Sequence, residues 1–231
     1  MRLLELFSGT NSVGKEFPGE VISLDILGTP THKVDILEWD YTIYPPGHFH
    51  MIWASPECTQ YSSARVKANT PRDLIGADKL VHRAIQIIGY FKPPAWFIEN
   101  PWGGMLRRRS VVSMLPMPKK VSYCKYGARY QKHTAILTNT DIEFKCCKKD
   151  CNAVVVGESG RMRHEGTALR GASKHGTRGY SLSKLHSIPP LLCRHICQHV
   201  SINKQHGENR SSVRTIEFPG ASAVEASLEE S

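Results

Sequence analysis

The sequence predicts an α/β fold with a parallel β-sheet, on the basis of two patterns. Short apolar runs recur through the first hundred residues and end on small or polar residues, as buried strands do; they cover residues 3–7, 20–25, 50–54 and 95–98. A longer stretch, Leu80–Phe91, has apolar residues at helical spacing. Strands that alternate with helices are typical of parallel sheets, whose ligands bind beyond the carboxyl ends of the strands.

The first elements surround a turn of small residues. Leu3–Phe7 is an apolar run that ends at Ser8–Thr10, and Val13–Phe17 has room for one helical turn. Small residues at such a turn let the backbone approach a ligand closely. Glu20–Asp25 is a second strand that ends on an acid, and Val34–Leu37 follows a loop.

The next elements lead to the most informative residues of the chain. His50–Ala54 is a strand, Pro93 and Pro94 end the helix Leu80–Phe91, and Ala95–Ile98 is the following strand. Five residues that we regard as candidate site residues fall at strand ends, so we expect them to converge on one edge of the sheet: Gly9, Asp25, Asp35, Cys58 and Glu99.

The second half of the chain is strongly basic. The formal net charge is +9, and residues 121–210 hold 15 basic and 6 acidic side chains. This excess favours a polyanionic partner, most simply nucleic acid, with a solvated basic surface as the alternative.

The seven cysteines are an odd number in a chain that shows no secretion signal. Met1–Leu6 is too short and too charged for a signal peptide, and no apolar run approaches the roughly 20 residues of a membrane span. We therefore expect reduced cysteines that serve as nucleophile, metal ligands or core, no membrane partner, and an intracellular location: the cytoplasm of a bacterial host, or the nucleus or virus factory of a eukaryotic one.

Two motifs predict a covalent-catalysis site. Pro56 and Cys58 follow one apolar strand, and Glu99 and Asn100 follow the next. A thiol nucleophile and a carboxylic acid at the ends of neighbouring strands can attack a substrate and protonate it. A buried core cysteine is the alternative for Cys58. Together the two motifs resemble those of the DNA (cytosine-5)-methyltransferase family, and the short chain resembles its phage and virus members.

The resemblance implies a Rossmann-like fold that binds S-adenosylmethionine (AdoMet). Phe7 and Gly9 match the family's first motif, while Asn11 and Ser12 replace its later glycines. An acid like Asp25 contacts ribose hydroxyls in nucleotide-binding sheets. The family's Asp-Ile pair, matched by Asp35 and Ile36, places its Asp at the adenine amino group. The implied cofactor residues are Phe7, Ser8, Gly9, Thr10, Asp25, Asp35, Ile36 and Pro56.

The resemblance also implies a mechanism on a cytosine flipped out of DNA. The Cys58 thiolate adds to carbon 6, which lets carbon 5 take a methyl group, while Glu99 protonates ring nitrogen 3. We expect nearby basic or helix-terminal groups to lower the pKa of Cys58.

The family's conserved pair of arginines is altered in this chain. Lys132 stands at the first and Thr134 at the second, so Lys132 keeps a charge but loses bidentate geometry. Arg129 either compensates or is an exposed side chain. Two alternatives therefore stay open: a catalytically silent relative that binds DNA or AdoMet, and another AdoMet-fold methyltransferase in which Cys58 is structural.

The expected domains follow from the same comparison. Residues 1–138 form the AdoMet-binding catalytic domain, and 139–180 a small target-recognition-like insertion rich in Cys, Lys and Arg. Residues 181–210 return to the first domain through a helix at Ile188–Val200, opened by two prolines. We expect residues 211–231 to form a frayed tail. We also expect the protein to be a monomer.

The insertion offers metal ligands and phosphate contacts. Cys147, Cys151 and His164 could hold a structural zinc ion, with His175 a further candidate and free thiols in a loop as the alternative. Cys193 and Cys197 fit buried thiols of the last helix better than metal ligands. Eight basic residues form the phosphate-facing set: Lys145, Lys148, Lys149, Arg161, Arg163, Arg170, Lys174 and Arg178.

Overall fold

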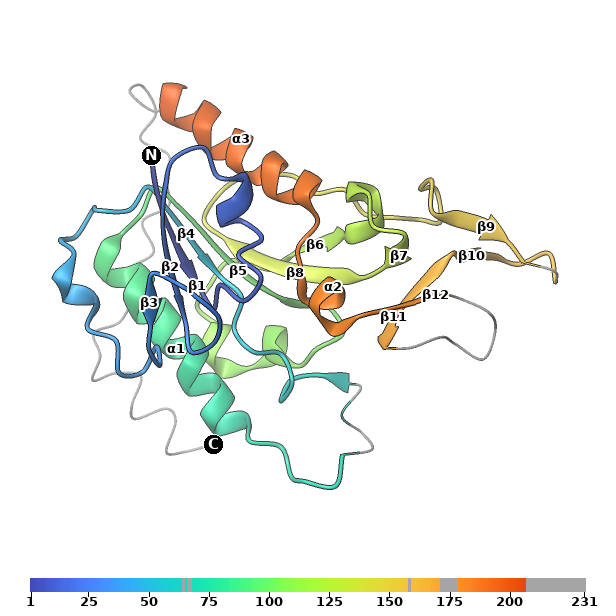
Figure 1. Cartoon of the computed structure of the whole chain (residues 1–231), viewed down its shortest axis with the longest axis horizontal. Coiled ribbons are helices and arrows are strands. Elements are labelled where there is room, and N and C mark those ends of the chain that lie inside the picture. Colours follow the sequence, from blue (N-terminus) through green and yellow to red (C-terminus); the bar gives the residue numbers. More distant parts are fainter. Residues whose placement is uncertain (64, 66–67, 158, 171–177, 207–231) are drawn as a thin grey trace.

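A seven-stranded sheet forms the centre of the protein (Figure 1). The structure is a computed structural model that describes residues 1–63, 65, 68–157, 159–170 and 178–206. The strands lie in the order β3 (His32–Lys33), β2 (Glu20–Asp25), β1 (Arg2–Leu6), β4 (Met51–Ala54), β5 (Ala95–Pro101), β8 (His133–Thr138) and β6 (Lys119–Ser122).

The first five strands in this order are parallel, whereas β8 runs antiparallel to β5 and β6 antiparallel to β8. The predicted α/β fold is therefore confirmed. The sheet order reverses around β1, which pairs with β2 on one side and β4 on the other. Ligands bind at such a switch point, and the loops that carry Gly9 and Cys58 both leave the sheet there.

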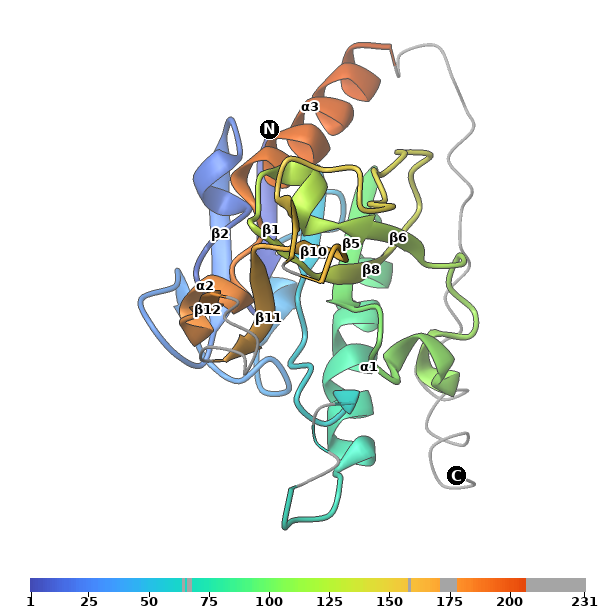
Figure 2. The ribbon, with the colours of Figure 1, turned by 90° about the vertical axis from the view of Figure 1, so that its right-hand side faces the viewer.

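Helices cover both faces of the sheet (Figures 1 and 2). Helix α1 (Leu74–Phe91) buries Val81, Ala84 and Ile88 against one face, in a cluster with Leu4 and Ile52. Helix α3 (Pro190–His206) covers the other face, where its buried residues pack with alternate strand positions; these are Leu192, Cys193, Ile196 and Cys197 against Leu3, Met51 and Phe97. Strands buried on both faces read as continuous apolar runs, which is the pattern the sequence shows.

Several predicted boundaries differ from the observed ones. Helix α1 begins before Leu80 because the Asp73 carboxylate caps it, accepting the Gly76 N–H at 2.7 Å. Only a 3-10 turn, η1 (Gly14–Glu16), forms in the segment 13–17. Asp35 lies in a turn after β3 rather than at the end of a strand.

The region between β8 and α3 contains more strands than its sequence indicates. β9 (Val154–Val156) and β10 (Met162–His164) form a hairpin, and β11 (Gly166–Arg170) and β12 (Arg178–Tyr180) form a small parallel sheet with β7 (Tyr130–Gln131), which precedes β8. Helix α2 (Leu182–His186) follows.

Short 3-10 turns complete the fold: η2 (Tyr41–Ile43), η4 (Leu106–Arg108), η5 (Ser110–Val112) and η6 (Tyr123–Tyr126). Residues 211–231, expected to be frayed, lie outside the described residues. Within the described ranges, every helix is too short or too polar to cross a bilayer.

Candidate active site and metal cluster

The turn after β1 is tightly wound. Phe7, Gly9 and Asn11 all have positive φ angles, of 55°, 47° and 52°. The Gly9 N–H donates to Asp25 Oδ2 at 2.8 Å, so the acid at the end of β2 holds this turn directly. Just beyond Asp25, the apolar side chains of Ile26 and Leu27 are 59% and 71% exposed. The carboxyl edge of the sheet therefore presents a narrow backbone turn, a carboxylate and an apolar surface side by side.

Glu5, a buried acid that was not among the predicted site residues, holds the segment that follows this turn. Glu5 of β1 accepts the N–H groups of Val13 at 3.1 Å and Gly14 at 2.9 Å, and burial raises its pKa to about 7. A side chain at Gly14 would place its Cβ 2.1 Å from Asn11 Oδ1 and 2.7 Å from Glu5 Oε2, so the side chains of Asn11 and Glu5 would have to shift to admit any other residue. Glu5 lies within the apolar run Leu3–Phe7, and the sequence does not show that its carboxyl group is buried and contacts Val13 and Gly14.

Residues at and before the start of helix α3 contact the segment that follows this turn. The Ile188 N–H donates to Ser12 Oγ at 3.1 Å, and Arg194 of α3 pairs with Glu16 at 3.2 Å. Residues that are far apart in the sequence thus complete one edge of the candidate site.

Contacts from two elements fix the loop that carries Cys58. Asn100, at the end of β5, donates from Nδ2 to the Pro56 carbonyl at 3.1 Å. The Tyr61 hydroxyl donates at 2.7 Å to Asp78, a buried carboxylate of α1 that also accepts two hydrogen bonds from Arg109. Since Pro56 and Tyr61 flank Cys58 in the sequence, the loop is held on both sides of the residue that carries the thiol.

Glu99 is buried among hydroxyl groups. Its Oε1 contacts the Tyr123 hydroxyl at 3.0 Å and the Thr134 hydroxyl, and Thr134 also donates to the Asn100 carbonyl at 2.9 Å. At Thr134, which the sequence resemblance aligns with the second arginine, a hydroxyl group lies beside the carboxyl group. Tyr123 has no counterpart among the predicted site residues.

Glu99 and Lys132 both lie within electrostatic reach of Cys58. Burial raises the pKa of the Cys58 thiol, the negative charge of Glu99 raises it further, and the positive charge of Lys132 opposes both. The expected lowering of this pKa was wrong, because burial outweighs the single nearby cation. Lys132 Nζ donates to the Leu185 carbonyl at 2.9 Å and lies 4.8 Å from the centroid of the Tyr123 ring.

Arg129 does not compensate for the missing arginines. Its guanidinium makes two hydrogen bonds of 2.7 Å to Glu165, and its side chain is 57% exposed. The ion pair joins the residue before β7 to the residue between β10 and β11.

The pKa of Cys58 can be measured through its reactivity. In the free protein, alkylation of Cys58 by iodoacetamide should show a midpoint above that of a small reference thiol, because the raised pKa keeps the thiol protonated at neutral pH. Replacing Lys132 with glutamine removes the opposing charge and should move the midpoint higher. Peptide-resolved mass spectrometry gives the rates, and a midpoint below the reference thiol would contradict this environment.

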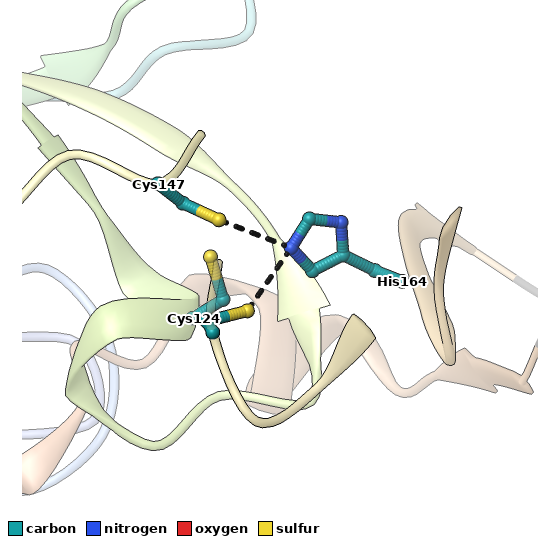
Figure 3. Close-up of side chains that lie close together, drawn as sticks. Cys124, Cys147 and His164 are labelled. Carbon is teal, nitrogen blue, oxygen red and sulfur yellow. Dashed lines mark hydrogen bonds between the residues drawn. The ribbon is translucent and has the colours of Figure 1, made fainter. Parts of the chain in front are cut away.

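A second cluster lies where the insertion meets η6. The ligand atoms of Cys124, Cys147, Cys151 and His164 all lie within 4.8 Å of one another. His164 Nε2 is 3.5 Å from the Cys147 sulfur and 3.3 Å from the Cys151 sulfur, and the side chains converge in Figure 3. The three predicted ligands are thus brought together. Cys124 was missed because it lies far upstream, before the insertion, and His175 lies outside the described residues.

The fold and the site define a Rossmann-like methyltransferase, with a mostly parallel sheet and a polar site at its carboxyl edge. No family model matches the chain. It is 34% identical over 214 residues to the "Probable DNA (cytosine-5)-methyltransferase" of Frog virus 3 (isolate Goorha), across 83% of this chain and 96% of that protein. The chain belongs to the DNA (cytosine-5)-methyltransferase family.

One solved structure shows a more distant similarity. It is described as a "putative DNA modification methyltransferase" encoded within an E. coli prophage, and it is 16% identical with a TM-score of 0.46. The match covers 60% of this chain and 46% of that chain, less than half of its length.

Proposed function

We propose that this protein methylates carbon 5 of cytosine in DNA through a covalent adduct with Cys58. The observation that carries the proposal is the meeting of Cys58 and Glu99 at the ends of the adjacent strands β4 and β5, with Lys132 beside them. A nucleophile and an acid at the ends of neighbouring strands, in a chain of this family, fit that reaction.

In the proposed reaction, Cys58 is the nucleophile and Glu99 is the proton donor. The Cys58 thiolate bonds to carbon 6 of a flipped cytosine, and the electrons displaced toward ring nitrogen 3 take a proton from Glu99. After carbon 5 has taken the methyl group, loss of the carbon 5 proton to solvent breaks the bond between carbon 6 and Cys58. Cys58 then leaves as the thiolate, and ring nitrogen 3 returns its proton to Glu99. Thr134 contacts two oxygens, the Asn100 carbonyl and Glu99 Oε1, and so holds the Glu99 carboxyl group at the end of β5. The negative charge of Glu99 raises the pKa of Cys58, so the two groups are electrostatically linked.

The turn after β1 fits the methyl donor AdoMet. Phe7, Ser8, Gly9 and Thr10 would hold it through the backbone, Asp25 would face its ribose, and Asp35, Ile36 and Pro56 would complete the site. The buried Oδ1 of Asn11 has no hydrogen-bond partner among the described residues, which suits a turn that meets a polar ligand. When bound, AdoMet supplies the methyl group that carbon 5 takes.

DNA is the partner that the basic residues favour. Among the eight predicted phosphate contacts, Lys145, Lys148, Lys149 and Arg161 are exposed, and Arg163 is half-buried. Lys174 lies outside the described residues, as do the side chains of Arg170 and Arg178. We propose that residues 1–138 form the catalytic domain, 139–180 the insertion and 181–210 the segment that returns to the catalytic domain. We also propose that the protein is a monomer with an intracellular location.

We also propose that a zinc ion binds the Cys124, Cys147, Cys151 and His164 cluster. One imidazole nitrogen faces two sulfurs at 3.3 and 3.5 Å, and a shared cation explains this better than two hydrogen bonds. In tetrahedral zinc sites, bonds of about 2.0–2.3 Å put the ligand atoms roughly 3.5–3.8 Å apart. Three thiolates and one histidine make a closed structural set with no position left for substrate.

A duplex containing 5-fluorocytosine tests the proposed chemistry. Fluorine at carbon 5 cannot leave as a proton, so a carbon 5 methyltransferase should remain covalently attached through Cys58 once the methyl group has been transferred. A band stable in denaturant supports the mechanism. AdoMet binding without any adduct or methylation would indicate a silent relative, and methylation without an adduct would make Cys58 structural.

Cofactor binding should depend on Asp35 more than on Asp25. Replacing Asp35 with alanine removes the carboxylate proposed to meet the adenine amino group and should weaken AdoMet binding roughly tenfold, the loss expected of a hydrogen bond to a charged group. Asp25→Asn should weaken it less, since its amide oxygen can still accept the Gly9 N–H. Isothermal calorimetry measures both, and native affinity in Asp35→Ala would contradict the assignment.

A further inference from the structure

The metal cluster and the catalytic acid share one short piece of chain. Cys124, a ligand in the cluster, directly follows Tyr123, whose hydroxyl contacts Glu99 Oε1 at 3.0 Å. Both side chains lie on η6, and Tyr123 is fully buried. Neighbouring residues of a single tight turn therefore face the metal on one side and the acid on the other.

Ser122 strengthens this connection. Its Oγ accepts the Cys147 N–H at 2.9 Å and contacts His133 Nδ1 at 2.8 Å, and its own N–H donates to the Lys145 carbonyl at 3.1 Å. The segment that carries Cys147 is thereby bound to the segment that carries Tyr123 by backbone as well as by the cluster.

Tyr123 is also held from the catalytic side. Its N–H donates to the Lys132 carbonyl at 2.9 Å, and the Lys132 ammonium group lies over its ring. The groups that contact Glu99 are thus Tyr123 from η6 and Thr134 from β8, and the charge of Glu99 acts on Cys58 in the loop after β4. With a threonine where the family has its second arginine, Tyr123 is one of only two side-chain partners that the described residues give to the Glu99 carboxyl group.

We infer that the zinc site positions the catalytic acid: by fixing Cys124, it holds the Tyr123 hydroxyl against Glu99. This inference rests on the proposed function of Glu99 and on the proposed zinc ion. Tyr123 is a positioning residue, because it acts on the substrate only through Glu99. The metal then affects proton transfer directly, in addition to stabilising an insertion that is too small for a core of its own.

Three variants test the inference. Tyr123→Phe removes only the hydroxyl, Cys151→Ser removes a metal ligand that lies in the insertion, and Cys151→His keeps four ligands. Cys146→Ser is the matched control, since Cys146 is exposed and lies outside the cluster. Zinc content is measured by elemental analysis, and kcat, KM for DNA and the pH dependence of kcat are measured for each protein.

The wild type should contain one zinc ion per chain. Tyr123→Phe should keep the zinc and lower kcat roughly tenfold with little change in KM, with the acidic limb of the kcat profile displaced. Cys151→Ser should displace the acidic limb of the kcat profile in the same way, and Cys151→His should restore the wild-type profile. The double variant Tyr123→Phe/Cys151→Ser should lose no more kcat than Tyr123→Phe alone. Absence of zinc, or a zinc-free protein that loses only DNA affinity while its kcat profile is unchanged, would overturn the inference.

A readout without turnover separates this inference from the proposed function. With 3-fluorotyrosine at position 123, the fluorine NMR signal should shift when zinc is chelated and return when zinc is added, and Glu99→Gln should shift it in the zinc-loaded protein. If these shifts occur in a protein that neither methylates nor forms the adduct, the positioning holds and the proposed reaction fails. If chelation leaves the signal unchanged in an active protein, the positioning fails and the reaction stands.

Discussion

Replacing Cys58 with serine should abolish both methylation and the 5-fluorocytosine adduct. A serine hydroxyl is far less acidic than a thiol, and the buried setting that raises the pKa of Cys58 disfavours an alkoxide even more strongly. The loop should keep its conformation, because Asn100 and Asp78 hold it through Pro56 and Tyr61 rather than through the thiol. AdoMet binding and the melting temperature should therefore remain near those of the wild type.

Cys146→Ser provides the matched control for this experiment. Cys146 is an exposed free thiol, so the same chemical change there should leave turnover unchanged. Turnover by Cys58→Ser at the wild-type rate would remove Cys58 from the mechanism and leave it as a structural residue.

Replacing Glu99 with glutamine should lower kcat by about 100-fold or more, the loss typical of a missing general acid. Glutamine keeps the size of the side chain and can still accept a hydrogen bond from the Tyr123 hydroxyl, but its amide cannot deliver a proton to ring nitrogen 3. Since Glu99 is buried and its charge raises the pKa of Cys58, the neutral variant should also alkylate faster at Cys58 near neutral pH. Single-turnover kinetics and the alkylation rate together separate the two effects.

Glu20→Gln is a suitable control, because Glu20 lies exposed at the amino end of β2, at the opposite edge of the sheet from the site. It should leave both rates unchanged. An unaltered kcat in Glu99→Gln would exclude Glu99 as the acid.

The sequence predicts the parallel half of the fold well, because buried strands and a long amphipathic helix have strong local signals. β2 has the predicted bounds, and Cys58 and Glu99 meet as neighbouring strand ends should. The strands β7, β9, β10, β11 and β12 were missed because runs of two to five residues carry no usable periodicity.

The missed residues of the site depend on contacts between distant segments. Cys124 joins the cluster only because η6 folds against the insertion, and Tyr123 reaches Glu99 only because β6 and β5 both flank β8. The pKa of Cys58 was predicted in the wrong direction since the sequence shows a nearby lysine but not the degree of burial. Local patterns locate strand ends, whereas charges and cross-chain contacts require the packed structure.

The hydrogen bond between Ile188 and Ser12 has a consequence for how the protein folds. It links positions separated by 176 residues, and the Arg194–Glu16 pair beside it spans a slightly longer stretch of sequence. Closing such loops costs entropy before any contact is gained, so native topologies of this kind fold slowly. During synthesis the turn after β1 is made long before Ile188 and Arg194, which complete this edge of the site. Competence to bind a nucleotide-like ligand should therefore appear as a late step of refolding, after the sheet itself has formed.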